Sequence, residues 1–564
     1  MTRPASRNSS LYFDYPHYPF VRPPELDGET IRHPVIIVGA GPVGVTAALE
    51  LARHGIRSVV LDDKDSVNDG SRAICIARHS FEILQQLGLS DRFVNKALGW
   101  THGTSYYRMQ PVFRLEMPHS EDERFYPMYN IQQQFIEQFL IDKAMEEALI
   151  ELRWQSRLEH IELHEDCAIL TIDTPEGDYK TESEYVIAAD GARSAVRKSL
   201  GLKLRGDAYE GKYVIVDIQM QSDYPTERRA FFDPPANPGS TVLVHKQPDN
   251  IWRVDYQLQD GEDEETALQE DNIRKRVGAI VDMIGEPGPW ELEWWSLYKA
   301  YTLALDDYRH ERVFFTGDAA HLVPIFGVRG LNSGFADAAN IGWKLAYALK
   351  GNAPDALLDS YSPERRGATM EIFDNATKST RFMTPPTRGY ALMREAALSL
   401  SISQQFSRPL INPRQSQPYT YVDSPLTAFP ERNAEFDSGP GAGSPLVNRR
   451  IGEDDYLLDH LGHGFSGLYF NKSGALPDDL DDLFSKLDTD SEPFTPIIIS
   501  TVQLNRDDLT VLQDREERIF DFYGADDGTF YLVRPDRHIT ARWRGIQPDE
   551  VLQAFKQALG EQSS

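Results

Sequence analysis

The sequence has little cysteine, no long apolar run and a shortage of positive charge. Cys75 and Cys167 are its only cysteines among 564 residues, too few for a disulfide framework, so we expect two buried thiols and a reducing, cytoplasmic location. Its apolar runs fall short of the ~20 residues of a membrane-spanning helix, and its first residues lack an apolar signal segment. Lys and Arg number 58 against 87 Asp and Glu, a net charge of −29, which disfavours nucleic acid and membrane partners.

The length favours several domains, because a single hydrophobic core stops growing at about 250–300 residues. A strand, a glycine turn, a helix and a second strand near the start predict a parallel sheet of Rossmann type in an α/β fold. Later short strands between Pro/Gly loops predict an inserted antiparallel sheet. Helices are expected over 132–152, 337–350 and 363–406. The expected segments are an N-terminal arm (1–33), the first part of the α/β domain (34–204), the antiparallel sheet (205–305), the completion of the α/β domain (306–406), a linker (407–447) and a small α/β domain (448–564).

The glycine turn after the first strand has the spacing of a dinucleotide site. Gly39, Gly41 and Gly44 match G-x-G-x-x-G, in which the glycines allow a tight turn, close approach of a pyrophosphate and helix packing. Asp62 follows the second strand, 23 positions after Gly39, close to the ~20 expected for a ribose-binding acid. Asp63 is the alternative. This turn by itself does not distinguish NAD from FAD.

Two further strand-to-helix junctions contain ionisable residues. In "DGARSAVR", Asp190 follows a buried strand where ligands of parallel sheets bind, and Ser194 could alternatively serve only as the N-cap of the next helix. In "GDAAHLVPIFGVRGLNSG", Asp318 follows another strand and a glycine-containing loop leads into a helix. We interpret His321 mainly as a structural residue of this junction.

Together the three motifs resemble those of the single-component FAD-dependent aromatic hydroxylases, which include p-hydroxybenzoate, phenol and 3-(3-hydroxyphenyl)propionate hydroxylases. The resemblance implies non-covalent FAD, transient NAD(P)H and O2, and a Rossmann-type FAD domain with an inserted substrate domain. The N–H groups of Gly330, Leu331 and Asn332, at the start of the helix that ends the last motif, suit the negative charge of reduced flavin. The residues implied to bind the cofactor are Gly39, Gly41, Gly44, Asp62, Arg78, Gln133, Asp190, Asp318, Gly330, Leu331 and Asn332.

The same resemblance implies that a flavin C4a-hydroperoxide hydroxylates a small phenolic substrate, with Pro324 beside the reactive flavin edge. The residue that deprotonates the phenol is left open, and Tyr256, His245 and Tyr213 of the antiparallel segment are candidates. A carboxylated substrate would need an arginine, for which Arg253, Arg228 and Arg329 are candidates. No metal site is expected.

The flavin loop departs from the usual P-x-x-G-G-x-G pattern at Val328 and Arg329. Valine disfavours positive φ, so we expect this loop to follow a different path. Arg329 either adds a cation near the flavin pyrimidine or points to solvent.

The C-terminal segment "YLVRPDRHITARW" resembles the thioredoxin-like domain of the phenol and 3-(3-hydroxyphenyl)propionate hydroxylases. It has no C-x-x-C, so a packing or homodimer role is expected instead of a redox role. Alternative functions are epoxidation, ring opening or tailoring of a polyketide-like substrate with the same cofactor, and a flavin-binding module without catalysis. A halogenase is disfavoured because W-x-W-x-I-P is absent.

Overall fold

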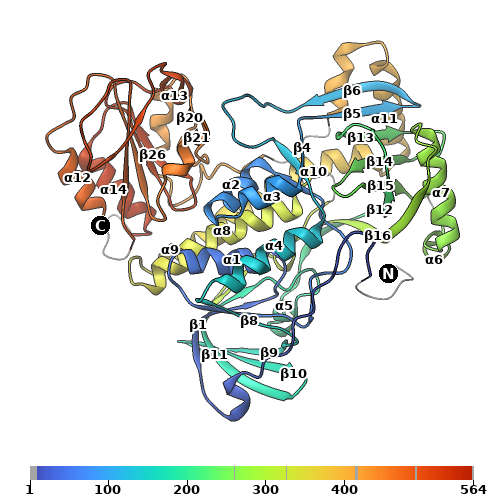
Figure 1. The fold of residues 1–564 in the computed structure, drawn as a ribbon, viewed down its shortest axis with the longest axis horizontal. Helices are drawn as coiled ribbons and strands as arrows, with labels where there is room; N and C mark the ends of the chain where they lie inside the picture. Colours follow the sequence, from blue (N-terminus) through green and yellow to red (C-terminus); the bar gives the residue numbers. More distant parts are fainter. Residues whose placement is uncertain (1–8, 260, 325–326, 413–416, 489–491, 562–564) are drawn as a thin grey trace.

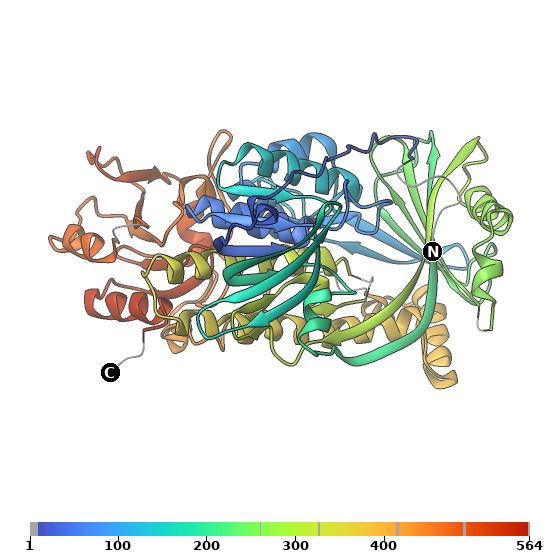
Figure 2. The ribbon, with the colours of Figure 1, turned by 90° about the horizontal axis from the view of Figure 1, so that it is seen from below.

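A computed structural model describes residues 9–259, 261–324, 327–412, 417–488 and 492–561. The chain forms three parts in a row, with a central α/β domain between an antiparallel sheet and a C-terminal domain (Figure 1 and Figure 2). Residues 1–8 of the expected arm and 413–416 of the expected linker lie outside the described residues. Within the described residues, every helix is too short or too polar to cross a membrane.

The central sheet brings five parallel strands to a common edge. Its order is β17-β18-β11-β1-β2-β8, with β10 and β9 added beside β11. Val38 pairs with both Leu61 and Ala188, Leu61 pairs with Arg153, and Ala188 pairs with Phe315, so five strand ends lie in line. The strands are β1 Arg32–Val38, β2 Ser58–Leu61, β8 Ile150–Arg153, β9 Arg157–Leu163, β10 Ala168–Thr174, β11 Gly177–Ala188, β17 Arg309–His310 and β18 Val313–Phe315.

Helices pack on this sheet and extend from it, and two of them differ from the sequence prediction. The helix expected over 132–152 ends at Glu146, because Ile150 begins β8 and pairs with Ser58 in the sheet. The helix expected over 363–406 is divided between Met383 and Arg388, where Pro385 and Pro386 interrupt it. The helices are α1 Pro42–Arg53, α2 Arg78–Gln86, α3 Ser90–Lys96, α4 Gln133–Glu146, α5 Ala195–Ser199, α8 Gly330–Leu349, α9 Ala356–Asp359, α10 Tyr361–Met383 and α11 Arg388–Ser401.

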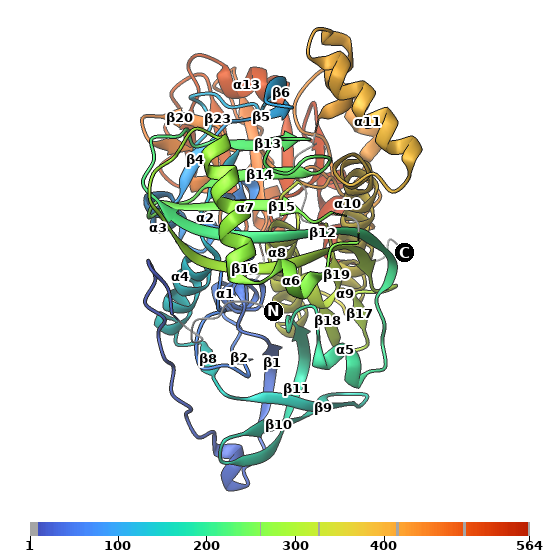
Figure 3. The ribbon, with the colours of Figure 1, turned by 90° about the vertical axis from the view of Figure 1, so that its right-hand side faces the viewer.

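The second large sheet is almost entirely antiparallel and has two different faces. Its order is β19-β16-β12-β15-β14-β13-β5-β6, so β5 and β6 come from before residue 205. Helix α7 lies across its outer face, with α8 and α10 behind the sheet (Figure 3). The elements are β5 His102–Tyr107, β6 Gln110–Glu116, β12 Arg205–Met220, β13 Arg228–Phe232, β14 Thr241–Lys246, β15 Ile251–Gln257, β16 Trp290–Ala304, β19 His321–Leu322, α6 Glu264–Ala267 and α7 Glu270–Met283.

Helices α6 and α7 were not predicted from the sequence. Acidic residues occupy the first turn of each helix, where they favour the positive end of the helix dipole. Ile273, Val277, Ile280 and Val281 then follow a helical spacing and are buried against the sheet. The outer face of the sheet is therefore apolar where it packs against α7.

A three-stranded sheet connects the two large ones. Its strands are β3 Cys75–Ala77, β7 Met128–Asn130 and β4 Leu98–Trp100, in the order β3-β7-β4. The Asn130 side chain donates to the carbonyl of Lys246 (2.8 Å) and accepts from the Trp100 indole (2.8 Å). These bonds fix β7, and with it β4, against β14.

The C-terminal domain is a mixed α/β unit. The order of its sheet is β24-β23-β22-β25-β26, in which β22, β23 and β24 are parallel and β25 and β26 are antiparallel additions. Its elements are β20 Arg450–Gly452, β21 Asp455–Tyr456, β22 Ser466–Asn471, β23 Thr495–Ser500, β24 Thr510–Gln513, β25 Phe530–Val533, β26 Ile539–Trp543, α12 Leu480–Leu487, α13 Arg518–Tyr523 and α14 Pro548–Ala558.

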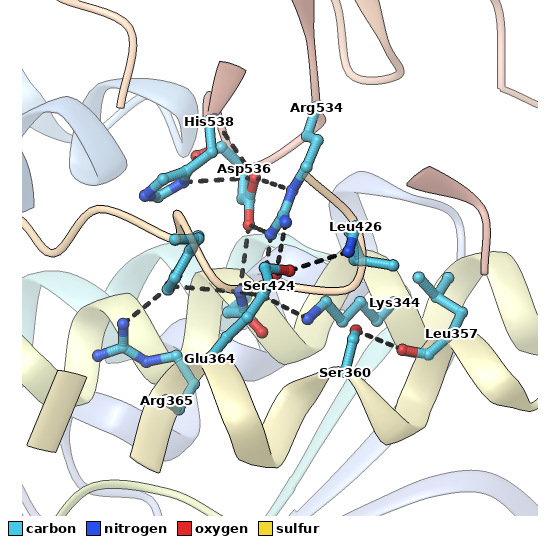
Figure 4. A network of polar contacts seen from close by, with 12 residues as sticks. Lys344, Leu357, Ser360, Glu364, Arg365, Ser424, Leu426, Arg534, Asp536 and His538 are labelled. Carbon is cyan, nitrogen blue, oxygen red and sulfur yellow. Dashed lines mark hydrogen bonds and ion pairs between the residues drawn. The ribbon is translucent and has the colours of Figure 1, made fainter. Parts of the chain in front are cut away.

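A buried ionic network fastens this domain to the central helices (Figure 4). Glu364 of α10 binds Lys344 of α8 at 2.6 Å and Arg534 of the C-terminal domain at 2.6 and 3.1 Å. Arg534 also pairs with Asp536 at 2.5 Å. Although burial alone would raise the pKa of Glu364, Arg534 and Lys344 hold it well below its ordinary value. The network makes the C-terminal domain continuous with the core of the central domain.

Candidate functional site

The glycine turn leaves open space at one glycine only. Gly39 has φ of +109°, and a Cβ there would lie 2.5 Å from the Ala189 carbonyl oxygen. A Cβ on Gly44 would lie 2.0 Å from the Gly39 carbonyl oxygen, so the protein itself requires both glycines. A Cβ on Gly41 would meet no atom within 4 Å. This space at the N-terminus of α1 is where a pyrophosphate can approach the backbone.

Asp62 faces the glycine turn. Its Oδ2 accepts a hydrogen bond from the Ala40 N–H at 2.8 Å, and its Oδ1 accepts from the Lys64 N–H at 3.0 Å. Burial raises the pKa of the Asp62 carboxyl. Asp63 is exposed, so Asp62 is the acid positioned at the turn.

The second junction is joined to the third by an arginine. Asp190 Oδ2 accepts from the N–H groups of Ala195 (2.6 Å) and Val196 (3.1 Å) at the start of α5. Ser194 accepts from the Arg197 N–H at 2.9 Å, so the interpretation of Ser194 as an N-cap is confirmed. Arg197 Nη1 donates to the Ala319 carbonyl at 2.9 Å. The "DGARSAVR" motif therefore supports the turn that contains Asp318.

Asp318 lies on the wall of a recess. It is exposed to solvent, yet the surrounding protein raises the pKa of its carboxyl, while His321, Arg72 and Arg197 act in the opposite direction. A residue that is both open to solvent and enclosed by protein atoms borders a recess. Arg72 is itself exposed and acts electrostatically on Asp318, so a cation lies near this carboxylate.

His321 is structural, as interpreted from the sequence. It is completely buried, and its Nε2 pairs with Asp337 of α8 at 2.8 Å. The Asp337 carboxylate also accepts from the Gly317 N–H (2.9 Å) and from Arg365 (2.6 Å). Although burial alone would raise it, Arg365 and His321 lower the pKa of Asp337 to about 2. Asp337 therefore fixes the turn just before Asp318.

The loop before α8 corrects one sequence expectation and excludes one of two alternatives that the sequence left open. Val328 has φ of +59°, so it retains the left-handed conformation expected of the usual glycine instead of avoiding it. Arg329 is buried and donates to the Ile372 carbonyl on α10 at 3.3 Å, so it does not point to solvent. Pro324 is buried at the start of this loop, and residues 325–326 lie outside the described residues.

The first turn of α8 has three N–H groups with no acceptor among the residues that the structure describes. The N–H groups of Gly330, Leu331 and Asn332 precede the first intrahelical bond, which is donated by Ser333 to Arg329. Asn332 uses its side chain to hold the surrounding segments, accepting from the Ala77 N–H (2.8 Å) and Ser80 hydroxyl (2.7 Å). The helix start is therefore fixed against β3.

Two predicted cofactor residues contact protein instead of the recess. Arg78 donates to the carbonyls of Phe125 and Pro118, both at 3.0 Å, and pairs with Glu123 at 2.9 Å. The role of Arg78 at the pyrophosphate therefore stays a prediction, and Arg72 is an arginine that interacts electrostatically with Asp318. Gln133 accepts from the Ala73 N–H at 2.9 Å and so positions the segment that carries Arg72.

The inner face of the antiparallel sheet has a row of ionisable side chains across four strands. Asp217 pairs in register with Arg253, Arg253 pairs with His245, and the pairing of Arg229 with Val244 puts Arg228 beside His245. Arg253 is 1% exposed and forms two 2.8 Å bonds to Asp217. It also donates to the Arg72 carbonyl at 2.9 Å, which brings the row against the segment at the recess.

Asp255 lies next to this row and was not identified from the sequence. It is 3% exposed, and its Oδ1 has no hydrogen-bond partner within the described chain. Burial raises the pKa of Asp255 to about 7, with Arg253 and Arg228 acting in the opposite direction. Burial, with Arg228 and Arg253, lowers the pKa of His245 well below its ordinary value. Asp255 is thus the carboxyl of this wall that can exchange a proton near neutral pH.

The structure separates the three predicted catalytic side chains of this sheet. His245 is on the inner face, but Tyr256 belongs to the apolar core beneath α7, with Arg276 of α7 over its ring at 5.4 Å. The prediction of Tyr256 as a base is therefore wrong. Tyr213 is on the inner face, and its hydroxyl lies 3.4 Å from the Thr384 hydroxyl; burial raises the pKa of Tyr213 to about 12. Tyr213 therefore remains protonated at neutral pH.

A cavity of about 280 Å³ opens on the inner face. Strands β5 and β13 form one wall, and the end of α10, the start of α11 and the 3₁₀ helix Gln405–Ile411 form the others. The lining side chains are mainly apolar and aromatic. They are Ser105, Arg228, Ala230, Phe232, Lys378, Ser379, Arg381, Phe382, Met383, Tyr390, Met393, Pro409, Leu410, Ile411 and Asn412.

Cys75 connects this wall to the start of α8. Its carbonyl accepts from the Asn332 side chain at 3.2 Å, and its thiol interacts electrostatically with Arg228, Arg253 and Asp255. Cys75 and Cys167 are both free and buried, which confirms the expectation from the sequence. In the part of the chain that the structure describes, no three His, Cys, Asp or Glu side chains are placed to hold a metal ion.

Asp255 and Asp337 did carry a signal in the sequence. Asp255 stands two positions after Arg253 in an otherwise apolar strand, so both face the same side, and two ionisable residues on one strand face indicate a polar wall. Asp337 interrupts the small and apolar residues of α8. Arg72 carried no such signal, because its position depends on Gln133 of α4.

Comparisons with known proteins agree with this geometry. A family model described as "FAD binding domain" matches residues 32–376. The 3-(3-hydroxy-phenyl)propionate/3-hydroxycinnamic acid hydroxylase of Mycobacterium sp. (strain JLS) is 28% identical over 541 residues, covering 92% of this chain and 91% of the relative. The hydroxylase of the same name from Escherichia coli (strain SMS-3-5 / SECEC) is 27% identical over 520 residues, covering 90% and 91%.

Solved structures share the fold across almost the whole chain. The flavin-dependent monooxygenase PieE, in complex with FAD and substrate, has a TM-score of 0.76 at 23% identity and covers 94% of this chain and 100% of its own. Aklavinone-11 hydroxylase, with FAD and aklavinone, has a TM-score of 0.74 at 20% identity, covering 93% and 99%.

Proposed function

The chain belongs to the FAD-binding-domain family, so FAD is its cofactor, and from this premise we propose that it is a monooxygenase that hydroxylates an aromatic small molecule. NAD(P)H and O2 are the co-substrates. One oxygen atom replaces a ring hydrogen as a hydroxyl, the other leaves as water, and NAD(P)H supplies the two electrons. The main support is the inner face of the antiparallel sheet, which has ionisable side chains and a cavity. Cys75 connects this face to the start of α8. The names of the curated relatives support the same reaction class.

The residues at the strand ends suit FAD. The space at Gly41 and the N-terminus of α1 suit the pyrophosphate, and Asp62 suits the ribose. Asp318, Arg72 and the free N–H groups of α8 suit the remainder of the cofactor. Bound FAD supplies the electron transfer and oxygen chemistry, and the protein orients the ring and excludes water. Pro324 is proposed beside the flavin edge.

Asp255 is the proposed acceptor of the phenol proton. A general base works best when its pKa is close to the working pH, and burial raises the pKa of Asp255 to about 7. His245 suits this role less, because its pKa is lowered well below the ordinary value, which weakens it as a base. Asp190 and Gln133 are proposed to shape the cofactor site indirectly. Asp190 holds the start of α5, and Gln133 holds the segment that contains Arg72.

The C-terminal domain is proposed to be thioredoxin-like with a packing role. Its mixed sheet, with parallel and antiparallel halves, supports the fold assignment. Its buried ion pairs with α8 and α10 support the packing role. Homodimer formation and a location in the reducing cytoplasm are further parts of this proposal, the second supported by the two free thiols.

The test uses the full chain with FAD. Absorbance identifies bound flavin, and oxidation of NADH and NADPH is followed with a panel that includes 3-(3-hydroxyphenyl)propionate, 3-hydroxycinnamate and phenol. Mass spectrometry under ¹⁸O2 should detect one labelled oxygen atom in the product. Substrate-stimulated oxidation without any labelled product, or absence of flavin binding, would overturn the proposal.

Gly41→Val supplies the matched variant. A Cβ at Gly41 meets no protein atom within 4 Å, and the valine side chain would occupy the proposed pyrophosphate space, so the apoprotein should melt as wild type and fail to bind FAD. Gly545→Val is the control, because a Cβ at Gly545 also meets nothing within 4 Å. Equal FAD affinity in both variants would contradict the site.

A further inference from the structure

Arg228 is a buried cation without a protein partner. It is 7% exposed, and no hydrogen bond or ion pair joins its guanidinium to any residue that the structure describes. It lines the 280 Å³ cavity. Burial lowers the pKa of Arg228, while Cys75, Asp255 and Tyr213 act in the opposite direction from a distance. Burial of an unpaired charge is costly, so this arrangement indicates a missing anion.

Other arginines near this face do have hydrogen-bond partners in the protein. Arg253 is saturated by Asp217 and by the carbonyls of Ser71 and Arg72. Arg394 donates to the Met383 carbonyl at 3.1 Å. Of the three arginines considered for a carboxylate from the sequence, Arg228 alone lines the cavity, because Arg329 binds the Ile372 carbonyl on α10.

The cavity favours an anion although the whole chain is acidic. Lys378 and Arg381 lie at its exposed side, and none of its described lining residues is Asp or Glu. The remaining lining is mainly apolar and aromatic, as for Phe232 and Phe382, with Ser105, Ser379 and Asn412 as its uncharged polar residues. Its volume lies just below the range of about 300–1,000 Å³ for ligand pockets, which suits a single aromatic ring.

We propose that Arg228 binds an anionic group of the substrate, and that the substrate is a single-ring aromatic acid. This inference rests on the proposed hydroxylase function. The planar guanidinium forms two parallel hydrogen bonds with a carboxylate, and the ring lies against the apolar lining. Arg228 therefore selects acids over neutral rings of the same shape.

The test compares 3-(3-hydroxyphenyl)propionate with its neutral amide. Binding to the FAD-loaded enzyme is measured from the change in flavin absorbance, and turnover from labelled product. Wild type should prefer the acid. Arg228→Met should weaken acid binding by at least about 30-fold, as for truncation of a buried charge pair, and change amide binding by less than about 3-fold. Arg228→Lys should retain part of the preference.

The acid-to-amide ratio within one variant controls for misfolding, because a general defect weakens both ligands. Arg381→Met is the matched control: it removes a cation from the exposed side of the cavity and should leave the ratio within about 3-fold of wild type, since exposed charges contribute little. An unchanged ratio in Arg228→Met, or a wild type that hydroxylates amide and acid equally well, overturns this inference alone. Absence of any labelled product from every ring overturns the proposed function instead.

Discussion

Asn332 donates its side-chain N–H to the Val328 carbonyl 2.8 Å away and so braces a valine whose φ is +59°. A β-branched residue rarely adopts this conformation and does so at a cost of about 1–3 kcal/mol. The same side chain binds the Cys75 carbonyl, the Ala77 N–H and the Ser80 hydroxyl. One amide therefore holds the flavin loop, the start of α8 and β3 together.

Asn332→Ala should loosen this junction. The change leaves the Ala77 N–H and the Val328 carbonyl without their partner, which costs about 1–3 kcal/mol for a buried group. The apparent melting temperature of the apoprotein should fall by several degrees, and FAD should dissociate more readily, as measured by flavin fluorescence. Ser80→Ala, which removes one bond only, should have a much smaller effect. Wild-type FAD affinity in Asn332→Ala would contradict the bracing role.

Arg72 should contribute more to FAD binding than Arg78, to which the sequence prediction gave that role. Arg72→Met removes an exposed cation beside Asp318, so FAD affinity should fall about 10-fold or more while the apoprotein melts as wild type. Arg78→Met removes the bonds to Phe125 and Pro118 and the Glu123 pair, so its apoprotein should melt at a lower temperature. Titration with FAD and thermal melting without it separate the two. Equal loss of FAD affinity with no melting change in Arg78→Met would restore the sequence prediction.

Glu364→Gln should strongly destabilise the contact between the C-terminal domain and the central helices. Glu364 neutralises Lys344 and Arg534 in a completely buried position, and breaking a buried pair costs about 3–5 kcal/mol. The apparent melting temperature should fall by many degrees. Asp508→Asn, in an exposed pair with Arg506, is the control and should melt as wild type. If both variants melt alike, the network does not join the two parts.

The parts of the site that follow from local chain geometry were predictable. Gly39 has a positive φ, Gly44 allows close contact of the helix with the turn, and Asp62 directly follows the second strand. Each of these features depends on neighbouring residues in the sequence. Arg72 was missed because its position depends on a residue distant in the sequence: Gln133 accepts hydrogen bonds from the N–H groups of Arg72 and Ala73. Tyr256 was misplaced because the face it occupies depends on the register with β12 and β14, a non-local property. The position of Asp255 on the ionisable face depends on the same strand register, so the sequence alone did not identify it.

Asp255→Asn should reduce activity in a pH-dependent way. If the carboxylate accepts the phenol proton, kcat/KM of the wild type rises with pH as Asp255 loses its proton around pH 7 and levels off above that. The variant should be about 10²–10⁴-fold slower above pH 8 and lack this rise. Rates of labelled-product formation between pH 5.5 and 9 provide the measurement. A variant with the wild-type profile would exclude Asp255 as the base.

Asp255 should also make the stability of the wild type depend on pH, in the opposite direction to its activity, and Asp255→Asn should remove this dependence. Burial raises the folded-state pKa of Asp255 from its ordinary 3.8 to about 7, so between these values the folded protein retains a proton that the unfolded chain has lost. The free energy of unfolding therefore falls as pH rises from about 4 to 7, by on the order of 2–4 kcal/mol. Asparagine stays neutral, so the variant should melt like wild type at pH 4.5 and several degrees higher at pH 8. A melting difference that does not change with pH would show that Asp255 is ionised throughout, held by Arg253 and Arg228, and would remove the physical basis for its role as a base.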